Sequence, residues 1–203
     1  IKIINNKEIF MDYNFFAMMS RMKYIDRWAL MRNSRSENIC EHSLDVSMLA
    51  HALAVISNTR LHKNINAEKT ALIALYHDAS EIITGDMPTP IKYYNNDIKD
   101  AFKEVEYVAN TKLLNMLPND MRDSYQSLFF KTAEDAYLWS LVKAADKLSA
   151  LIKCIEEAHS GNKEFISAEA TIRKALEESP LDEVQIFMNE FLPSYGKTLD
   201  ELT

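Results

Sequence analysis

Glycine is scarce in this chain of 203 residues, where it occurs only three times, at positions 85, 161 and 196. No segment matches GxGxxG or a Walker-type sequence, so the usual glycine-rich nucleotide-binding loops are excluded. Proline is also rare, with five residues, and few positions must therefore interrupt a helix. Together with long periodic segments, these shortages predict an all-α fold.

The chain also lacks a positive net charge and any run of basic residues. Its formal net charge is −7, whereas binding to a nucleic-acid polymer depends on a basic surface, so we expect no such partner. We find no apolar stretch of about 18 residues and expect no membrane span. Cys40 and Cys154 form no CxxC motif. Free thiols are typical of a cytoplasmic protein, which is the localisation that we expect.

The length suits one domain, and no linker or repeat divides the chain. The apolar periodicity predicts helices over about residues 12–24, 37–57, 66–83, 97–117, 119–129, 134–159, 164–178 and 181–191. The segment DMPTPIKYY is expected to be a loop, because Pro88 and Pro90 cannot continue a helix. Met11 is a possible start, so we expect a domain over residues 11–203 and an N-terminal extension over residues 1–10.

The stretch LYHDASE, residues 75–81, places three ionisable residues inside the predicted third helix. His77, Asp78 and Glu81 are three or four residues apart, so a continuous helix would carry them on one arc of its surface. A solvated polar stripe has the same spacing, but the flanking residues are apolar nearly all round, which indicates a central helix. Burying such groups without partners is costly, and a bound cation offsets the cost.

Two other segments show the same anomaly. His42 begins an amphipathic run, and Asp146 interrupts the apolar segment LWSLVKAADKLSALI. Taken alone, His42 could be an ordinary core or surface histidine, and Asp146 could pair with Lys143 or Lys147. Together with the His-Asp pair of the third helix they supply two imidazoles and two carboxylates, a set that suits a divalent transition ion.

The other three histidines are not expected to be ligands. His51 follows His42 by nine residues, which places it about half a turn away around a continuous helix. We interpret His62 and His159 in the same way.

The order of His42, His77, Asp78 and Asp146 resembles the metal-binding signature of the HD-domain phosphohydrolases, a helical superfamily. The segments around these residues resemble one of its groups, the bacterial YfbR-like 5′-deoxynucleotidases. They are IDRW (25–28), MRNSRSENICEHS (31–43), LYHDASEIITGDMPTPIKYY (75–94), LVKAADKLSALIKCIEE (141–157) and FLPSYGKTLDE (191–201). The similarity extends from about Met11 to the end of the sequence.

The resemblance implies an all-α HD-domain helical bundle that forms a homodimer. It implies a phosphomonoester hydrolase that converts deoxyribonucleoside 5′-monophosphates to deoxynucleoside and phosphate, with little base selectivity and with discrimination against ribonucleotides. It also implies one divalent metal ion, which could be cobalt, manganese, copper, magnesium or zinc. The ligands that it implies are His42, His77, Asp78 and Asp146, of which Asp78 and Asp146 would also contact the substrate.

The resemblance further assigns roles to three residues outside the ligand set. Glu81 is expected to orient or deprotonate water, with a hydrogen bond to a metal ligand as the alternative. Arg27 is expected to clamp the phosphate through its forked donors, with an exposed surface arginine as the alternative. Trp28 is expected to fill the space that a ribose 2′-hydroxyl needs, with a plain core aromatic as the alternative.

The turn after the third helix resembles the sugar pocket of the family. Asp86 is expected to accept a hydrogen bond from the 3′-hydroxyl, and Met87, Pro88 and Thr89 are expected to line the same pocket. Without the resemblance, Asp86 is simply a turn residue before a proline. The other functions left open are another HD-type nucleotide phosphohydrolase or phosphodiesterase, and a non-catalytic nucleotide-binding regulator.

Overall fold

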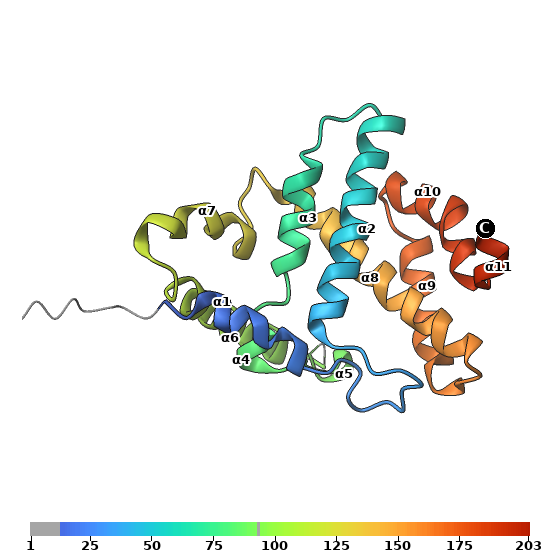
Figure 1. Ribbon diagram of the computed structural model, residues 1–203, viewed down its shortest axis with the longest axis horizontal. Coiled ribbons are helices and arrows are strands. Elements are labelled where there is room, and N and C mark those ends of the chain that lie inside the picture. The colour runs from blue at the N-terminus through green and yellow to red at the C-terminus, as the bar shows by residue number, and fades with distance from the viewer. Residues whose placement is uncertain (1–12, 93) are drawn as a thin grey trace, which may run out of the picture.

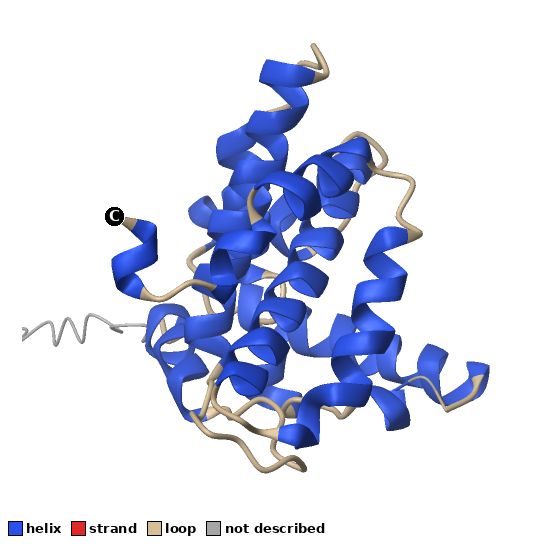
Figure 2. Cartoon of the chain, turned by 90° about the vertical axis from the view of Figure 1, so that its right-hand side faces the viewer, coloured by secondary structure: helices blue, strands red, loops and turns tan. Residues whose placement is uncertain are grey.

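The computed structural model describes residues 13–92 and 94–203, and the predicted extension over residues 1–10 lies outside these ranges. Its longer helices are α2 (Ile39–Arg60), α3 (Ala67–Tyr76), α6 (Asn96–Leu114), α7 (Asn119–Phe129), α8 (Ala136–His159), α9 (Ile166–Glu177) and α10 (Asp182–Glu190). The shorter ones are α1 (Phe15–Met19), η1 (Ser20–Tyr24), α4 (Glu81–Thr84), α5 (Thr89–Lys92), η2 (Lys163–Phe165), η3 (Leu192–Gly196) and α11 (Leu199–Leu202). The described ranges contain helices and loops but no strand (Figure 2), which confirms the predicted all-α, single-domain fold.

Three helices form the centre of the domain. In Figure 1, α2 and α3 stand side by side, and α8 crosses behind them. The core is built mainly from aliphatic side chains on these helices, among them Leu53, Ile73, Leu141 and Leu148, which have no solvent-exposed surface. Their burial removes apolar area from water, which is the main favourable term in folding.

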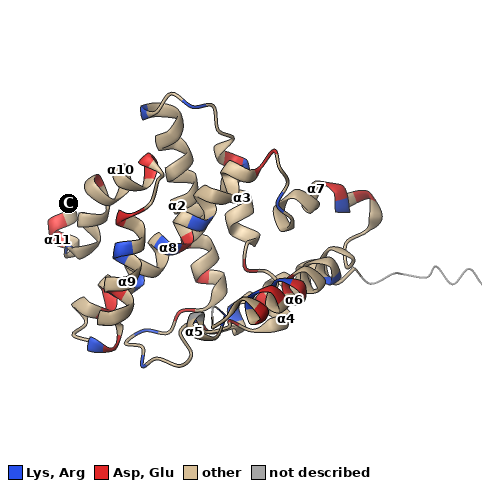
Figure 3. Cartoon of the chain, turned by 180° about the vertical axis from the view of Figure 1, so that it is seen from behind, with Lys and Arg blue, Asp and Glu red and all other residues tan. Residues whose placement is uncertain are grey.

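Helix α2 begins where the side chain of Asn38 accepts hydrogen bonds from the backbone N–H groups of Cys40 and Glu41, both at 3.0 Å. By length and composition alone this helix could cross a membrane, contrary to the expectation from the sequence, but half of the segment is buried inside the domain. Core helices of soluble proteins meet the same criterion. Helix α6 is not apolar in this way, because acidic and basic positions are interspersed along its surface (Figure 3).

The prediction of one continuous helix over residues 66–83 was wrong. Helix α3 ends at Tyr76, and a turn over residues 77–80 precedes α4. The imidazole Nδ1–H of His77 donates to the carbonyl of Ala74 at 2.7 Å. In a continuous helix that carbonyl would accept from the backbone N–H of Asp78 instead. The side chain thus competes with the helical hydrogen bond, and α4 continues next to α6 rather than along α3 (Figure 1).

The segment DMPTPIKYY is a loop only in its first part. Residues 85–88 are irregular, but α5 begins at Thr89. Pro90 lies in the first turn of α5, where a helix needs no N–H donor, so this proline is compatible with the helix. The predicted helix over 12–24 is likewise divided into α1 and the 3₁₀ helix η1, and the one over 164–178 into η2 and α9.

Candidate metal centre

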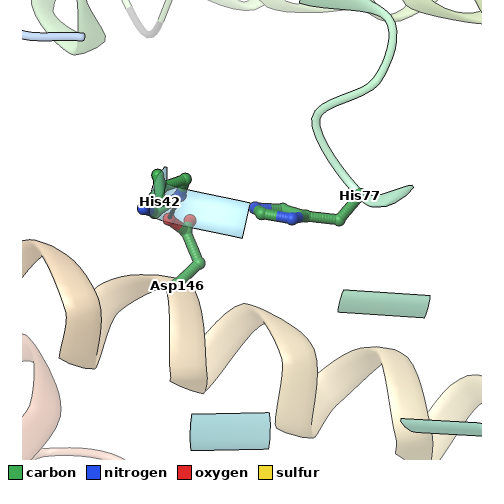
Figure 4. Close-up of side chains that lie close together, drawn as sticks. All are labelled: His42, His77 and Asp146. Carbon is green, nitrogen blue, oxygen red and sulfur yellow. Dashed lines mark ion pairs between the residues drawn. The ribbon is translucent and has the colours of Figure 1, made fainter. Parts of the chain in front are cut away.

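Helices α2 and α8 and the turn after α3 bring three predicted ligands together. His42 comes from the first turn of α2, His77 from the turn after α3, and Asp146 from the middle of α8 (Figure 4). One ligand atom from each residue can be chosen so that all three lie within 4.8 Å of one another. Three segments that are far apart in sequence therefore meet at one point, as the order of the residues predicted.

His42 is fully buried and contacts a polar group on each side of its ring. Its Nε2 lies 3.1 Å from Oδ1 of Asp146 and 3.5 Å from Oδ2 of Asp78. Its Nδ1 lies 3.2 Å from the hydroxyl of Ser149 and 3.7 Å from Oε1 of Glu37. The ring is thus fixed with one nitrogen directed at the two carboxylates.

The ring of His77 is also fixed with its Nε2 toward a carboxylate, but by a different contact. Because a carbonyl only accepts, the 2.7 Å contact with Ala74 requires the proton on Nδ1. Nε2 then faces Oδ2 of Asp78 at 3.1 Å. The rings of His77 and His42 lie with their centroids 5.4 Å apart, so Asp78 contacts both imidazoles and adjoins the group of three ligands.

The two Nε2 atoms test whether these residues fit a metal ion. Both are buried, and among the described residues neither has a well-aligned hydrogen-bond partner, although a carboxylate oxygen lies 3.1 Å from each. Buried nitrogen atoms without such partners are costly. Two imidazole nitrogens and two carboxylates are a donor set for a borderline divalent ion, so the residues present fit such an ion.

The charges in this cluster influence one another strongly. Burial lowers the pKa of His77, but Asp78 and Asp146 outweigh it and raise the pKa to about 9. Burial raises the pKa of Asp78 and of Asp146, but the two imidazoles outweigh it and lower both values. The carboxylates are therefore held in their charged form, which is the form that binds cations, whereas His77 must release its proton for its Nε2 to bind one.

Arg27 lies beside the cluster and is not an ordinary surface residue, because its side chain is only 12% exposed. Its Nη1 donates to Oε2 of Glu37 at 3.1 Å, and its Nη2 lies 3.8 Å from Oδ1 of Asp146. Burial lowers its pKa, but Glu37, Asp146 and Asp78 outweigh this effect and raise it. The guanidinium is thus a fixed positive charge at the edge of the cluster.

Trp28 has a backbone conformation that is unusual for a bulky residue, with φ at 57°. Its indole Nε1 donates to the same Oε2 of Glu37 at 3.1 Å, and its ring meets Phe165 edge-to-face with centroids 5.3 Å apart. The side chain is only partly buried. Trp28 is therefore held at both ends of its ring rather than enclosed in the core.

Glu81 begins α4 and is buried, with 6% of its surface exposed. Among the described residues its Oε2 has no hydrogen-bond partner. Burial, followed by repulsion from Asp78 and Asp86, raises its pKa to about 9, against the opposing effects of Arg27 and Lys92. A strongly perturbed carboxyl next to a group of candidate ligands is characteristic of a functional site.

The turn after α4 places Asp86 near Arg27 and Trp28. Gly85 has φ at 73°, in the region that L-residues rarely adopt, and this turns the chain after α4. Burial raises the pKa of Asp86, while Arg27 and a hydrogen bond from the Trp28 backbone oppose the increase. Met87 and Pro88 follow and are half-buried.

The side chain of Thr89, the last residue predicted for this pocket, lies outside the described part of the structure. The three remaining histidines, His51, His62 and His159, are all exposed and are not members of the ligand group.

Reasoning from the sequence missed two charged residues at this site. Glu37 joins Arg27, Trp28 and His42 through one carboxylate, but its place just before the α2 N-cap suggested only a helix start. Lys92 pairs with Glu106 at 2.8 Å, and its charge acts on both Asp78 and Glu81. Lys92 could have been found from its place in DMPTPIKYY, the segment expected to be a loop, because loops on a rigid scaffold often carry recognition residues.

Comparisons with known proteins identify the family of this chain. The family described as 5′-deoxynucleotidase YfbR-like matches residues 14–195. A 5′-deoxynucleotidase of Erwinia tasmaniensis is 48% identical over 190 residues, which cover 94% of this chain and 96% of that protein.

Two solved structures share the fold. An HD-domain phosphohydrolase from Listeria innocua matches with a TM-score of 0.75 and 21% identity, over 90% of this chain and 88% of its own. The cyanophage S-2L HD phosphohydrolase DatZ, bound to dA and one catalytic zinc ion, matches with a TM-score of 0.62 and 23% identity. That match covers 90% of this chain and 96% of the cyanophage chain.

Removal of one candidate ligand should abolish tight metal binding. We expect His77→Ala to weaken the binding of Co²⁺ or Mn²⁺ by more than the roughly 10–100-fold that loss of an outer-shell partner costs. Isothermal titration of the purified protein measures the effect. His51→Ala is the matched control, since His51 is exposed on the same helix as His42 but outside the cluster. Equal affinity in all three proteins would exclude this cluster as the metal site.

Proposed function

This chain belongs to the YfbR-like 5′-deoxynucleotidase family, and we propose from this that it hydrolyses deoxyribonucleoside 5′-monophosphates to deoxynucleoside and phosphate. The observation that carries the proposal is the group formed by His42, His77 and Asp146, with the Arg27 guanidinium 3.8 Å from one of its members. A cation site beside a fixed arginine suits a phosphoryl group, because both stabilise negative charge on its oxygens.

We propose that His42, His77, Asp78 and Asp146 hold one divalent metal ion. The buried Nε2 atoms and the charged carboxylates support this ligand set. Such an ion, when bound, supplies Lewis acidity that polarises the phosphoryl group and favours ionisation of neighbouring water and carboxyl groups. The cyanophage relative contains zinc, and the ligand types here also suit cobalt, manganese or copper, with magnesium less well matched to imidazole.

In this proposal Arg27 binds the phosphate. A guanidinium has five N–H donors in a planar fork, and Glu37 accepts one of them at 3.1 Å. Donors therefore remain that can form a forked contact with phosphate oxygens. Glu37 fixes the plane of the guanidinium, so the side chain is ordered before the substrate binds.

Glu81 acts in this proposal as the base that accepts a proton from the attacking water. Its burial and the unpartnered Oε2 among the described residues support the role, because a carboxyl in such a place has a raised pKa and is more basic than in water. Hydrolysis breaks the bond between phosphorus and the deoxynucleoside 5′-oxygen and forms a bond between phosphorus and the water oxygen. The leaving 5′-oxygen takes up a proton.

We further propose that Trp28 and the turn after α4 recognise the sugar. Asp86 would accept a hydrogen bond from the 3′-hydroxyl, and Met87, Pro88 and Thr89 would line the pocket. The partly buried, doubly anchored indole of Trp28 is suited to exclude a 2′-hydroxyl, because it cannot yield without losing its contacts with Glu37 and Phe165. These residues act on the sugar, so base identity would matter little.

The domain boundaries, the localisation and the assembly are also part of the proposal. We propose a catalytic domain over residues 11–203, which the family match over 14–195 supports. We also propose a cytoplasmic protein, which the free thiols of Cys40 and Cys154 support.

A homodimer is expected to use the exposed face of α2. Leu44, Met48 and Val55 are 54%, 57% and 38% exposed and lie four and seven residues apart, on one side of the helix. A self-complementary apolar stripe of this kind suits a two-fold interface. Light scattering should give twice 23.4 kDa, and Met48→Lys should give the monomer mass if the stripe is the interface.

A phosphate-release assay tests the activity. We expect dAMP and dGMP with Co²⁺ or Mn²⁺ to release phosphate at similar rates, and AMP and deoxynucleoside 3′-monophosphates to react much more slowly. A single hydroxyl rejected by a closed pocket typically changes kcat/KM by about 100-fold. Hydrolysis of a cyclic nucleotide to its monophosphate, or of a nucleoside triphosphate, with no phosphate released from dAMP, would assign the chain to another HD-type reaction.

Glu81→Gln should separate metal binding from turnover. The substitution keeps the shape of the side chain but removes the base, so kcat for dAMP should fall by about 10²–10⁴-fold while the affinity for Co²⁺ stays nearly constant. Glu104→Gln is the control, because Glu104 is an exposed carboxylate of the neighbouring α6 and is not a member of the ligand group. Full activity of Glu81→Gln with metal bound would reduce Glu81 to a supporting contact.

A further inference from the structure

One face of α8 carries four polar residues in succession. Asp146, Ser149, Lys153 and Glu157 are spaced three, four and four residues apart, so they follow one side of the helix. The first two belong to the metal centre, where they contact the two ring nitrogens of His42. The last two lie farther along the helix and have no part in the proposed reaction.

The carboxylate of Glu157 binds the backbone of the segment that follows Trp28. Its side chain is 1% exposed, and its Oε2 accepts from the N–H of Ser34 at 2.8 Å and from Nδ2 of Asn162 at 2.7 Å. It also accepts from Nζ of Lys153, which donates in turn to the carbonyl of Arg35 at 2.6 Å. A buried ion pair thus holds both the N–H and the C=O groups of residues 34–35.

This hydrogen bonding accounts for the charge state of the pair. Burial raises the pKa of Glu157, but Lys153, Asn162 and the N–H of Ser34 outweigh it and lower the pKa to about 2. The carboxylate is therefore charged throughout the range in which enzymes are assayed, and the contacts with the segment persist there.

The same segment begins at Trp28, whose backbone is in the left-handed region. Its carbonyl accepts from the N–H of Met31 at 2.9 Å and from Nδ2 of Asn33 at 3.2 Å. On the other side, the indole ring packs on Phe165, and Nζ of Lys153 lies 5.7 Å from the centroid of the same phenyl ring. At one end of the segment 28–35, the backbone of residues 34 and 35 hydrogen-bonds to the ion pair. At the other end, Trp28 packs on Phe165, and Lys153 of the pair lies over the same phenyl ring.

We propose that the Lys153–Glu157 pair is a positioning device that holds Trp28 in its strained conformation and thereby sets the discrimination between deoxyribose and ribose. The inference rests on the function proposed above. A tryptophan in the left-handed region is strained and persists only where surrounding contacts fix it. Buried ion pairs add little net stability but do fix geometry, and here most of their hydrogen bonds reach this one segment.

A second buried carboxylate provides a matched control. Glu183 is fully buried and accepts hydrogen bonds from Lys63, Tyr137 and Ser57, where α2, α8 and α10 meet. It resembles Glu157 in burial and in having a lysine partner, but its contacts are with side chains of α2, α8 and the loop after α2. A substitution there perturbs the fold without acting on residues 28–35.

The test compares kcat/KM for dAMP and AMP in Glu157→Gln, Lys153→Met and Glu183→Gln, each as the full chain loaded with Co²⁺. We expect the preference for dAMP over AMP to fall roughly tenfold in the first two variants, mainly through a lower KM for AMP. We expect it to stay at the wild-type value in Glu183→Gln. A purely structural role would lower both activities together and leave the ratio unchanged, and this result in an active Glu157→Gln overturns the inference.

A readout without turnover accompanies the kinetics. Hydrogen exchange of the backbone amides of residues 28–35 should accelerate in Glu157→Gln, while the amides of α8 keep their protection. Unchanged exchange in residues 28–35 overturns the inference. If Glu157→Gln does not fold, Asn162→Ala replaces it, because it removes the amide that joins Glu157 to the carbonyl of Arg32 at 2.7 Å. The same two measurements then decide.

The outcome also separates this inference from the proposed function. A wild-type protein that releases phosphate from neither nucleotide, or from both equally, overturns the role of Trp28 in sugar recognition together with this inference. A wild type that prefers dAMP, with the preference retained in both variants of the pair, overturns this inference alone.

Discussion

The site depends on the contact between the imidazole of His42 and two carboxylates in the interior of the domain. A fully buried ring with 3.1 Å and 3.5 Å contacts to Asp146 and Asp78 requires that α2, α8 and the turn after α3 meet at a fixed distance. The hydroxyl of Ser149 and the carboxylate of Glu37 hold the opposite nitrogen. Glu37 also accepts hydrogen bonds from Arg27 and Trp28. The positions of these two side chains therefore depend on the same contacts that fix the His42 ring.

The candidate ligands could be singled out in the sequence because each is an ionisable residue in an apolar helical context, and that anomaly is visible without coordinates. The break at His77 could not be predicted in the same way. The break coincides with a hydrogen bond from the His77 ring to the carbonyl of Ala74, and the helical periodicity of the sequence continues across it. The apolar pattern of ALIALYHDASEII is consistent with either geometry, so only the positions of the atoms distinguish them.

Glu37 and the Lys153–Glu157 pair illustrate a second limit. In the sequence, a glutamate next to a helix start, or a lysine and a glutamate four residues apart, is typical of a solvated surface. Their importance comes from burial and from tertiary partners, which for the pair lie more than a hundred residues away, as in the contact between Glu157 and Ser34. Neither property has a local signature. The helix boundaries of α2, α7 and α8, in contrast, depend on periodicity within the segment itself and, for α2, on the Asn38 cap, and they were predicted to within a few residues.

The face of α8 that joins Asp146 to Glu157 has a consequence for how this protein can change over time. An α-helix rotates about 100° for each residue, so inserting or deleting one residue between these positions would turn one end of the face away from its targets. Substitutions at the intervening exposed positions do not change the relative orientation of the two ends. The eleven-residue interval should therefore be constant in length among relatives in which both ends serve these purposes, even where its letters differ.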